Sequence, residues 1–313
     1  MLLSAPRFFW SAALALGAWV FVAARAAESV AAVPRMLPDL AYLAPDRAEK
    51  LDLYLPVAPA KGKLSPAVVW IHGGGWAGGT RAEARAKAIC TTLAKAGYVA
   101  LTIDYKLGAG AWPTNLLDCK NAVRFLRTRA AEWRVDPDRI AVAGGSAGGH
   151  LALMVGYTAG LPELEPDAPF PGVSSAVRAV IDMYGISDLR TRRTTTADGV
   201  VQENFRSVGP VSVFGSADNA TVYGLASPVT HIRAGLPPTL ILHGDKDTTV
   251  DLRQSQDLAA ALAKAGLRHE LVVVPGAGHT FDFESWGKKP LSRDLRPVAL
   301  AFLEKHLAPR VAK

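Results

Sequence analysis

Short segments that are apolar at nearly every position recur along this chain, and they constrain its fold more than any other feature. They are Ala67–His72, Tyr98–Tyr105, Ile140–Gly145, Ala179–Gly185, Thr239–Gly244 and Glu270–Gly276. A strand with one solvent-facing side alternates apolar and polar residues, whereas these runs do not. They are typical of strands that are buried on both faces of a mainly parallel sheet.

Segments with helical periodicity lie between these runs. Apolar residues recur at helical spacing in 82–93, before Gly97, and in 252–262, before Gly266. Further helices are expected over 115–130, 147–159 and 295–307. The alternation predicts an α/β fold with a mostly parallel central sheet and helices on both faces.

The remaining segments do not follow this alternation of strands and helices. Residues 37–55 alternate without an intervening helix, which predicts an antiparallel hairpin at the sheet edge. The Pro-rich stretch 161–173 is expected to be a surface loop. Residues 188–232 show little periodicity, and because loops of that length are usually functional, we expect a small lid or partial cap there. We interpret residues 27–313 as one domain without internal repeats.

The N-terminus has the features of a secretory signal peptide. The apolar run 8–24 is followed by a small-x-small tripeptide at 24–26, which predicts a signal peptide over 1–26. Cleavage is expected after Ala26, or alternatively after Ala27, with export to the periplasm or the exterior and no stable membrane partner afterwards. An uncleaved anchor is the alternative, because the run approaches the roughly 18 residues that span a bilayer.

The sequence "AGGSAGG" places one serine among glycines, between an expected strand and an expected helix, as Gly144-x-Ser146-x-Gly148. A strand that turns sharply into a helix at a serine leaves no space for side chains two positions to either side. The serine is then held in a strained conformation over the positive end of the helix. Simple packing of a Gly-rich strand end is the alternative for this motif alone.

The sequence "IHGGGWAGG" follows the first apolar run. Successive glycines expose backbone N–H groups at close range, and acyl transfer needs such donors for the developing oxyanion. We expect the amides of Gly74, Gly75 and Ala147 to form this oxyanion hole. A flexible loop or a phosphate-binding turn is the alternative, but the Gly-Lys-Ser/Thr ending of a P-loop is absent.

A serine nucleophile requires a base and an acid that orients the base. The segments "LHGDKDTTVD" and "VPGAGHTFDF" each follow an expected strand, so both loops emerge at the sheet edge that carries Ser146. We predict Asp247 as the acid and His279 as the base. The chain order Ser, Asp, His is that of the α/β-hydrolase arrangement.

Other acids and histidines compete for these roles. Asp245 is nearer the strand end, where it is expected to cap the turn, and Asp251 has the position of a helix N-cap. His243 ends a buried strand and His150 lies on an expected helix. Both histidines are interpreted as structural.

Together, "HGGGW", "GGSAGGHLA", "HGDKDTTV" and "GAGHTF", in this order, resemble the α/β-hydrolase superfamily. The likeness runs from about Leu37 to the C-terminus and is to hormone-sensitive-lipase-like carboxylesterases and, more closely, bacterial feruloyl/acetyl-xylan esterase-like (BD-FAE-like) enzymes. It implies a serine esterase with the triad Ser146, Asp247 and His279, no cofactor and no metal. The segment before the first strand is too short for the N-terminal cap of hormone-sensitive-lipase-like members, which favours the carbohydrate-esterase branch.

The resemblance also suggests the class of substrate. It implies short-chain or carbohydrate-linked acetyl or feruloyl esters, in small molecules or polysaccharides, and Trp76 and Trp112 are candidates for stacking on a sugar or an aromatic acyl group. An exopeptidase or formamidase with the same triad is one alternative. A non-catalytic binding member of the fold is the other, although all three triad residues are present.

Charge and cysteine content narrow the remaining function classes. The formal charge is +7, but the basic residues are scattered and clusters such as Arg190–Arg193 are too short for a phosphate-tracking stripe, so nucleic acid is not an expected partner. An oxidising compartment favours pairing of Cys90 with Cys119. The family's topology places their helices on opposite faces, whereas a disulfide needs Cα atoms within about 7 Å, so the pairing stays open.

Overall fold

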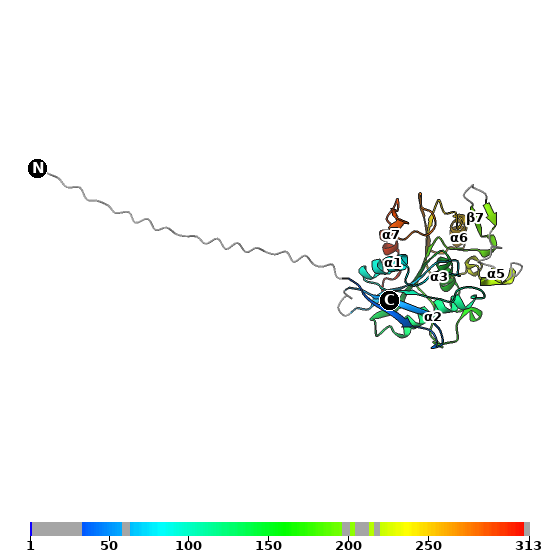
Figure 1. Ribbon diagram of the computed structural model, residues 1–313, viewed down its shortest axis with the longest axis horizontal. Helices are drawn as coiled ribbons and strands as arrows, with labels where there is room; N and C mark the ends of the chain where they lie inside the picture. The colour runs from blue at the N-terminus through cyan, green and yellow to red at the C-terminus, as the bar shows by residue number, and fades with distance from the viewer. Residues whose placement is uncertain (2–32, 58–62, 196–200, 204–212, 216–219, 310–313) are drawn as a thin grey trace. The chain divides into compact units, whose positions relative to one another are not determined.

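The computed structural model describes Met1 and residues 33–57, 63–195, 201–203, 213–215 and 220–309 (Figure 1). Apart from Met1, the predicted signal peptide therefore lies outside the described residues. Within the described ranges, no helix has the length and apolar character needed to cross a membrane.

The central sheet has eight strands among the described residues, in the order β1-β2-β4-β3-β5-β6-β9-β10. Their bounds are β1 Arg35–Ala41, β2 Lys50–Leu55, β3 Ser65–Ile71, β4 Val99–Ile103, β5 Val135–Gly145, β6 Ala179–Met183, β9 Thr239–Gly244 and β10 His269–Val274. β2 pairs antiparallel with both β1 and β4, and all other neighbours are parallel. The mostly parallel sheet and the hairpin at its edge are confirmed.

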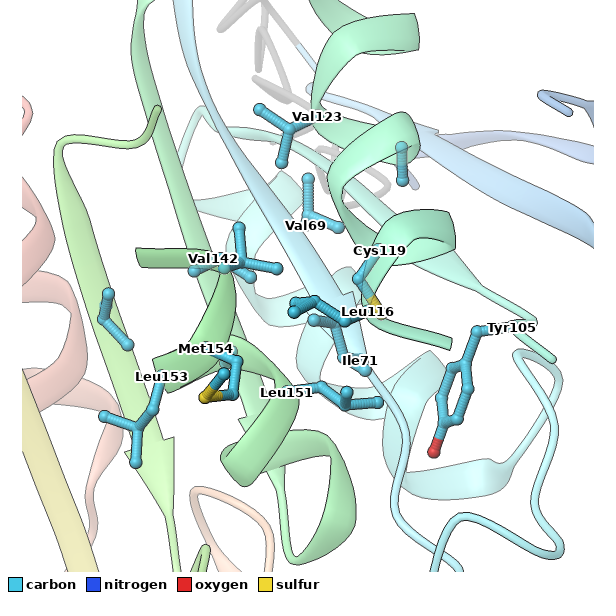
Figure 2. Packing of buried hydrophobic residues seen from close by; sticks show 14 of the residues in the cluster. Val69, Ile71, Tyr105, Leu116, Cys119, Val123, Val142, Leu151, Leu153 and Met154 are labelled. Carbon is cyan, nitrogen blue, oxygen red and sulfur yellow. The ribbon is translucent and has the colours of Figure 1, made fainter. Parts of the chain in front are cut away.

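Helices cover both faces of this sheet. Their bounds are α1 Ala84–Lys95, α2 Thr114–Thr128, α3 Ala147–Tyr157, α6 Arg253–Lys264 and α7 Arg296–His306. Successive residues of a strand point to opposite faces, so continuous apolar strands build two separate cores. Val69 and Val142 pack with residues of α2 and α3 (Figure 2), whereas Val68 belongs to the cluster with α1 and α7, which lie together in Figure 1.

The two cysteines are buried free thiols. Cys90 on α1 belongs to one core and Cys119 on α2 to the other. The sheet therefore separates them, as the family's topology implied.

Shorter elements complete the described fold. The Pro-rich loop contains one 3-10 turn, η1 (Pro162–Leu164), and a small hairpin pairs β11 (Ser285–Trp286) with β12 (Lys289–Pro290). The 188–232 excursion holds η2 Leu189–Thr191, β7 Arg193–Thr195, β8 Val201–Glu203, α5 Ala220–Leu225 and η3 Pro228–His231. Its Phe214 and Tyr223 join the core that contains Trp76. Residues 196–200, 204–212 and 216–219 of the expected lid lie outside the described residues.

Candidate active site

Ser146 occupies the sharp turn between β5 and α3. Its φ of 58° and ψ of −122° place it in a conformation that non-glycine residues rarely adopt. A Cβ on Gly144 would lie 2.2 Å from the carbonyl oxygen of Gly148, and one on Gly148 would lie 2.1 Å from that of Ile71. Because neither contact is sterically possible, glycine is required two residues before and after the serine.

Three loops bring a hydroxyl, an imidazole and a carboxylate together in one chain of hydrogen bonds. Ser146 Oγ lies 2.9 Å from Nε2 of His279, and Nδ1 of His279 lies 2.7 Å from Oδ2 of Asp247. When Nδ1–H donates to the carboxylate, Nε2 accepts the serine proton. The His279 side chain is 12% exposed, so the imidazole remains within reach of a ligand. The structure thus brings together the three residues predicted from the sequence.

Asp247 is held as an anion by the turn that follows β9. Its side chain is fully buried, and Oδ1 accepts hydrogen bonds from the amides of Thr249 at 2.8 Å and Val250 at 2.9 Å. Burial acts to raise the pKa of this carboxyl, but hydrogen bonds from His243, His279 and the Val250 amide outweigh it and hold the pKa well below its usual range. The acid is therefore ionised whenever His279 needs an acceptor.

His243 is a site residue whose contact with the acid was not predicted. Its Nε2 lies 3.2 Å from Asp247 Oδ2 and 2.9 Å from the carbonyl oxygen of Val250, while Nδ1 lies 2.7 Å from Ser255 Oγ. Both ring nitrogens are satisfied, as expected of a structural histidine. The sequence signal that could have revealed this contact was the spacing of the two residues. A tight turn after β9 brings Asp247 back to His243, which lies four positions earlier.

The competing acids serve the backbone. Asp245 Oδ1 accepts a hydrogen bond from the amide of Gly276 at 2.7 Å, which ties together the ends of β9 and β10. Asp251 Oδ1 accepts from the amide of Arg253, the first residue of α6, at 2.9 Å. Asp245 thus caps the turn as expected, whereas the prediction of Asp251 as the helix N-cap is wrong, because Leu252 holds that position and Asp251 lies one residue before it.

The glycine loop after β3 lies against the serine. A Cβ on Gly73 would lie 3.2 Å from Ser146 Cβ, and Gly74 and Gly75 have φ values of +111° and +61°. Tyr105 Oη donates to the carbonyl of His72 at 2.9 Å and so fixes the start of the loop. Among the described residues, the amides of Gly74, Gly75 and Ala147 have no hydrogen-bond acceptor, so they are available as donors.

The two tryptophans suggested for stacking differ. Trp76 is fully buried, and its Nε1–H donates to Nδ1 of His150 at 3.2 Å. Its indole also packs edge-on against Phe214 at 5.0 Å between ring centroids. The prediction of Trp76 as a stacking residue is therefore wrong, because core packing covers its ring. Trp112 is only partly buried and remains a candidate.

His150 is structural, as expected. Its Nε2–H donates to the carbonyl of Ala226 at 2.7 Å, while Nδ1 accepts from Trp76. Burial lowers the pKa of this imidazole to about 4, so it is neutral at physiological pH. In the part of the chain that the structure describes, no three His, Cys, Asp or Glu side chains converge in a way that could hold a metal ion.

Known proteins resemble this chain in sequence and in fold. The BD-FAE family model matches residues 51–262. Esterase LipC of Mycobacterium tuberculosis is 33% identical over 244 residues, which cover 76% of this chain and 58% of LipC. Esterase LipQ of the same organism is 31% identical over 78% of this chain and 57% of LipQ. The chain thus spans less than three fifths of the length of these curated relatives.

Solved esterases share the fold. A truncated carbohydrate esterase from gut microbiota superimposes with a TM-score of 0.75 and 25% identity, covering 90% of this chain and 99% of that one. Esterase 2 of Thermogutta terrifontis with bound butyrate gives a TM-score of 0.69 and 31% identity, covering 90% and 98% of the two chains. With the site geometry and the matched family region, these similarities show that the chain belongs to the BD-FAE family and has the α/β-hydrolase fold.

Proposed function

We propose that this protein hydrolyses carboxylic esters through an acyl-enzyme formed on Ser146. One observation carries the proposal: Ser146 Oγ, the His279 ring and the Asp247 carboxylate form a continuous hydrogen-bonded series with distances of 2.9 and 2.7 Å. A serine hydroxyl becomes a competent nucleophile only when a positioned base takes its proton. The strained turn at Ser146 presents the hydroxyl to that base.

In the acylation step, Ser146 Oγ attacks the carbonyl carbon of the ester while Nε2 of His279 takes the serine proton. The negative charge that develops on the carbonyl oxygen is stabilised by the amides of Gly74, Gly75 and Ala147, which have no acceptor among the described residues. Asp247 stabilises the imidazolium through its contact with Nδ1.

Collapse of the tetrahedral intermediate breaks the bond to the alcohol, which leaves with the proton from Nε2 of His279. Water then attacks the acyl carbon, and His279 takes its proton and returns it to Ser146 Oγ. The products are a carboxylic acid and an alcohol, and the enzyme returns to its initial state without a cofactor.

Two lines of support point to the substrate class. A solved relative holds butyrate, which favours short acyl chains, and another is named a carbohydrate esterase. We therefore propose short-chain or carbohydrate-linked acetyl or feruloyl esters. The 188–232 excursion would form a partial cap over the site, and Trp112 would contribute to substrate binding. We also propose that the protein is exported, because the N-terminal segment has the features of a signal peptide.

Hydrolysis of acetyl-xylan, methyl ferulate and p-nitrophenyl esters of increasing chain length tests the proposal. Ser146→Ala should lower turnover of a short-chain p-nitrophenyl ester by a factor on the order of 10⁶. Ser174→Ala, at an exposed serine away from the series, is the matched control and should retain wild-type activity. A Ser146→Ala protein with near wild-type turnover would contradict the proposed nucleophile. Faster cleavage of an aminoacyl anilide than of any ester would overturn the ester assignment and leave the triad intact.

A further inference from the structure

Trp286 is an exposed aromatic side chain attached to the loop that carries His279. It lies in β11, it is 37% exposed, and its Nε1–H donates to the carbonyl oxygen of His279 at 3.0 Å. A backbone bridge to Phe281 closes the segment between them. The indole is therefore tied to the backbone of the residue that acts as the base in the proposed mechanism.

The indole is fixed at a second point by Gly278. A Cβ on Gly278 would lie 2.5 Å from Cζ2 and 3.0 Å from Cε2 of Trp286. One edge of the ring therefore rests against the backbone just before His279, and any larger residue at 278 would displace it. With its N–H already paired, the part of the ring that remains exposed is its apolar surface. An orientation fixed before binding reduces the entropic cost of contact with a ligand.

Other exposed apolar side chains lack this arrangement. Met36 on β1 and Val273 on β10 are 42% and 37% exposed, but both are aliphatic residues on the two outermost strands of the sheet. Single exposed apolar residues of that kind need no functional explanation. Trp286 differs because its ring is held at two points, by the carbonyl oxygen of His279 and by the backbone at Gly278.

The direction of catalysis indicates which part of a substrate would meet this ring. In the proposed mechanism, His279 gives its proton to the leaving alcohol, so the alcohol portion of the ester lies on the side of His279. The segment around Trp286 also carries the exposed Lys288, whose ammonium group suits a ligand bearing several hydroxyl groups, while Asp282 and Glu284 are paired within the protein. A sugar presents both an apolar ring face and such hydroxyls.

We propose that Trp286 is a platform on which the pyranose ring of an acylated carbohydrate stacks, while Ser146 and His279 act on its acyl group. The inference rests on the proposed esterase function and assigns the alcohol half of the substrate. It replaces Trp76, whose ring is buried, with an aromatic residue that a ligand can reach.

Two esters with the same acyl group test this platform. Steady-state kinetics are measured with an acetylated xylo-oligosaccharide and with ethyl acetate, which has no ring. Trp286→Ala should raise KM for the oligosaccharide about three- to tenfold and leave KM for ethyl acetate within about twofold. Met36→Ala, which removes a similarly exposed side chain at the far edge of the sheet, should change neither value.

Trp286→Phe separates stacking from positioning. Phenylalanine keeps an aromatic face but cannot donate to the carbonyl of His279, so KM for the oligosaccharide should stay within about threefold of wild type. A loss of kcat on both esters in this variant would report the lost N–H contact. If Trp286→Ala instead lowers kcat on both esters equally and leaves both KM values unchanged, Trp286 only positions His279 and the platform is rejected.

A binding measurement separates this inference from the proposed function. Calorimetric titration of the Ser146→Ala protein with the acetylated xylo-oligosaccharide should show binding that weakens three- to tenfold when Trp286→Ala is added. Ethyl acetate hydrolysis together with oligosaccharide binding that is insensitive to Trp286 would reject the platform alone. Trp286-dependent binding by a protein that hydrolyses neither ester would support the platform and reject the esterase.

Discussion

His243 Nε2 lies 3.2 Å from Asp247 Oδ2, the same carboxylate oxygen that contacts His279 Nδ1 at 2.7 Å. Ser255 Oγ holds the other nitrogen of the His243 ring at 2.7 Å, so the imidazole cannot turn away from the acid. Asp247 thus lies between two imidazoles, one in contact with Ser146 Oγ and one fully buried. His243 is a positioning residue that fixes the carboxylate at the geometry His279 needs.

Replacing His243 tests this relationship. His243→Leu removes the buried donor and should lower kcat about ten- to a hundredfold, since a hydrogen bond to a charged group contributes about 1.5–3 kcal/mol. KM for a short ester should change little, because His243 does not face the substrate. His243→Gln restores one donor and should recover part of kcat. A Leu variant that is thermally destabilised but has wild-type kcat would show a structural role only.

Gly148 is required by the close approach of α3 to β3. In Gly148→Ala, the added Cβ would lie 2.1 Å from the carbonyl oxygen of Ile71 and 2.5 Å from that of His72. The variant should lose about 1–3 kcal/mol of unfolding free energy through overpacking, and its activity should fall because the glycine loop after His72 is displaced.

Gly224→Ala provides the matched control for that measurement. Nothing lies within 4 Å of a Cβ at Gly224, which lies in α5, so alanine should be neutral or add up to about 1 kcal/mol through helix propensity. Urea unfolding and esterase assays on both variants check the contrast. Equal stability of the two proteins would contradict the steric argument at Gly148.

The elements that position the site could be predicted because their signals are local. The apolar run Thr239–Gly244 coincides with β9, and the expected helix at 147 begins at Ala147. Buried parallel strands must be apolar on both faces, so their sequence alone reveals them. The series Ser146, Asp247 and His279 followed from a second local rule, since loops at the carboxyl ends of parallel strands meet at one edge.

The contacts that could not be predicted depend on tertiary packing. Trp76 is covered by Phe214, a residue far away along the chain, so its burial depends on tertiary packing. Trp286 lies in a two-residue strand, which is too short to give a periodic signal. Its proximity to His279 arises from a hairpin closure that no apolar pattern marks. The sequence thus indicated the base and the acid, but not which tryptophan contacts the loop that carries the base.

The burial of both cysteines predicts inert thiols. Burial raises the pKa of the Cys90 thiol and, with the neighbouring Asp118 charge, that of Cys119, so little reactive thiolate forms in the folded protein. A thiol reagent such as DTNB should label neither residue in the native state and both after unfolding in urea. Mass spectrometry of air-exposed protein should show no intramolecular disulfide. Labelling of the native protein within minutes would contradict this burial.

Asp182 predicts a pH dependence of stability. Its carboxyl is fully buried, Oδ1 accepts a hydrogen bond from the Gly185 amide at 3.0 Å, and Oδ2 has no partner within the described residues. Burial raises its pKa from the ordinary 3.8 to about 7, although His243 and the Gly185 amide act in the opposite direction. Between these two pKa values the folded state binds more protons than the unfolded state, so the free energy of unfolding falls as pH rises.

Asp182→Asn removes this titration. The variant should gain unfolding free energy relative to wild type as pH rises from 4 to 8, by up to about 4 kcal/mol, because each pKa unit corresponds to about 1.4 kcal/mol. Urea unfolding at several pH values measures the difference. Asp257→Asn, at an exposed carboxylate of α6, controls for the change in net charge and should follow the wild-type curve.

A stability difference between Asp182→Asn and wild type that stays constant across this range would show that Asp182 is ionised throughout. The anion would then have to be stabilised in place, by His243 and by the positive end of α3, where a Cβ on Gly149 would lie 2.4 Å from Asp182 Oδ1.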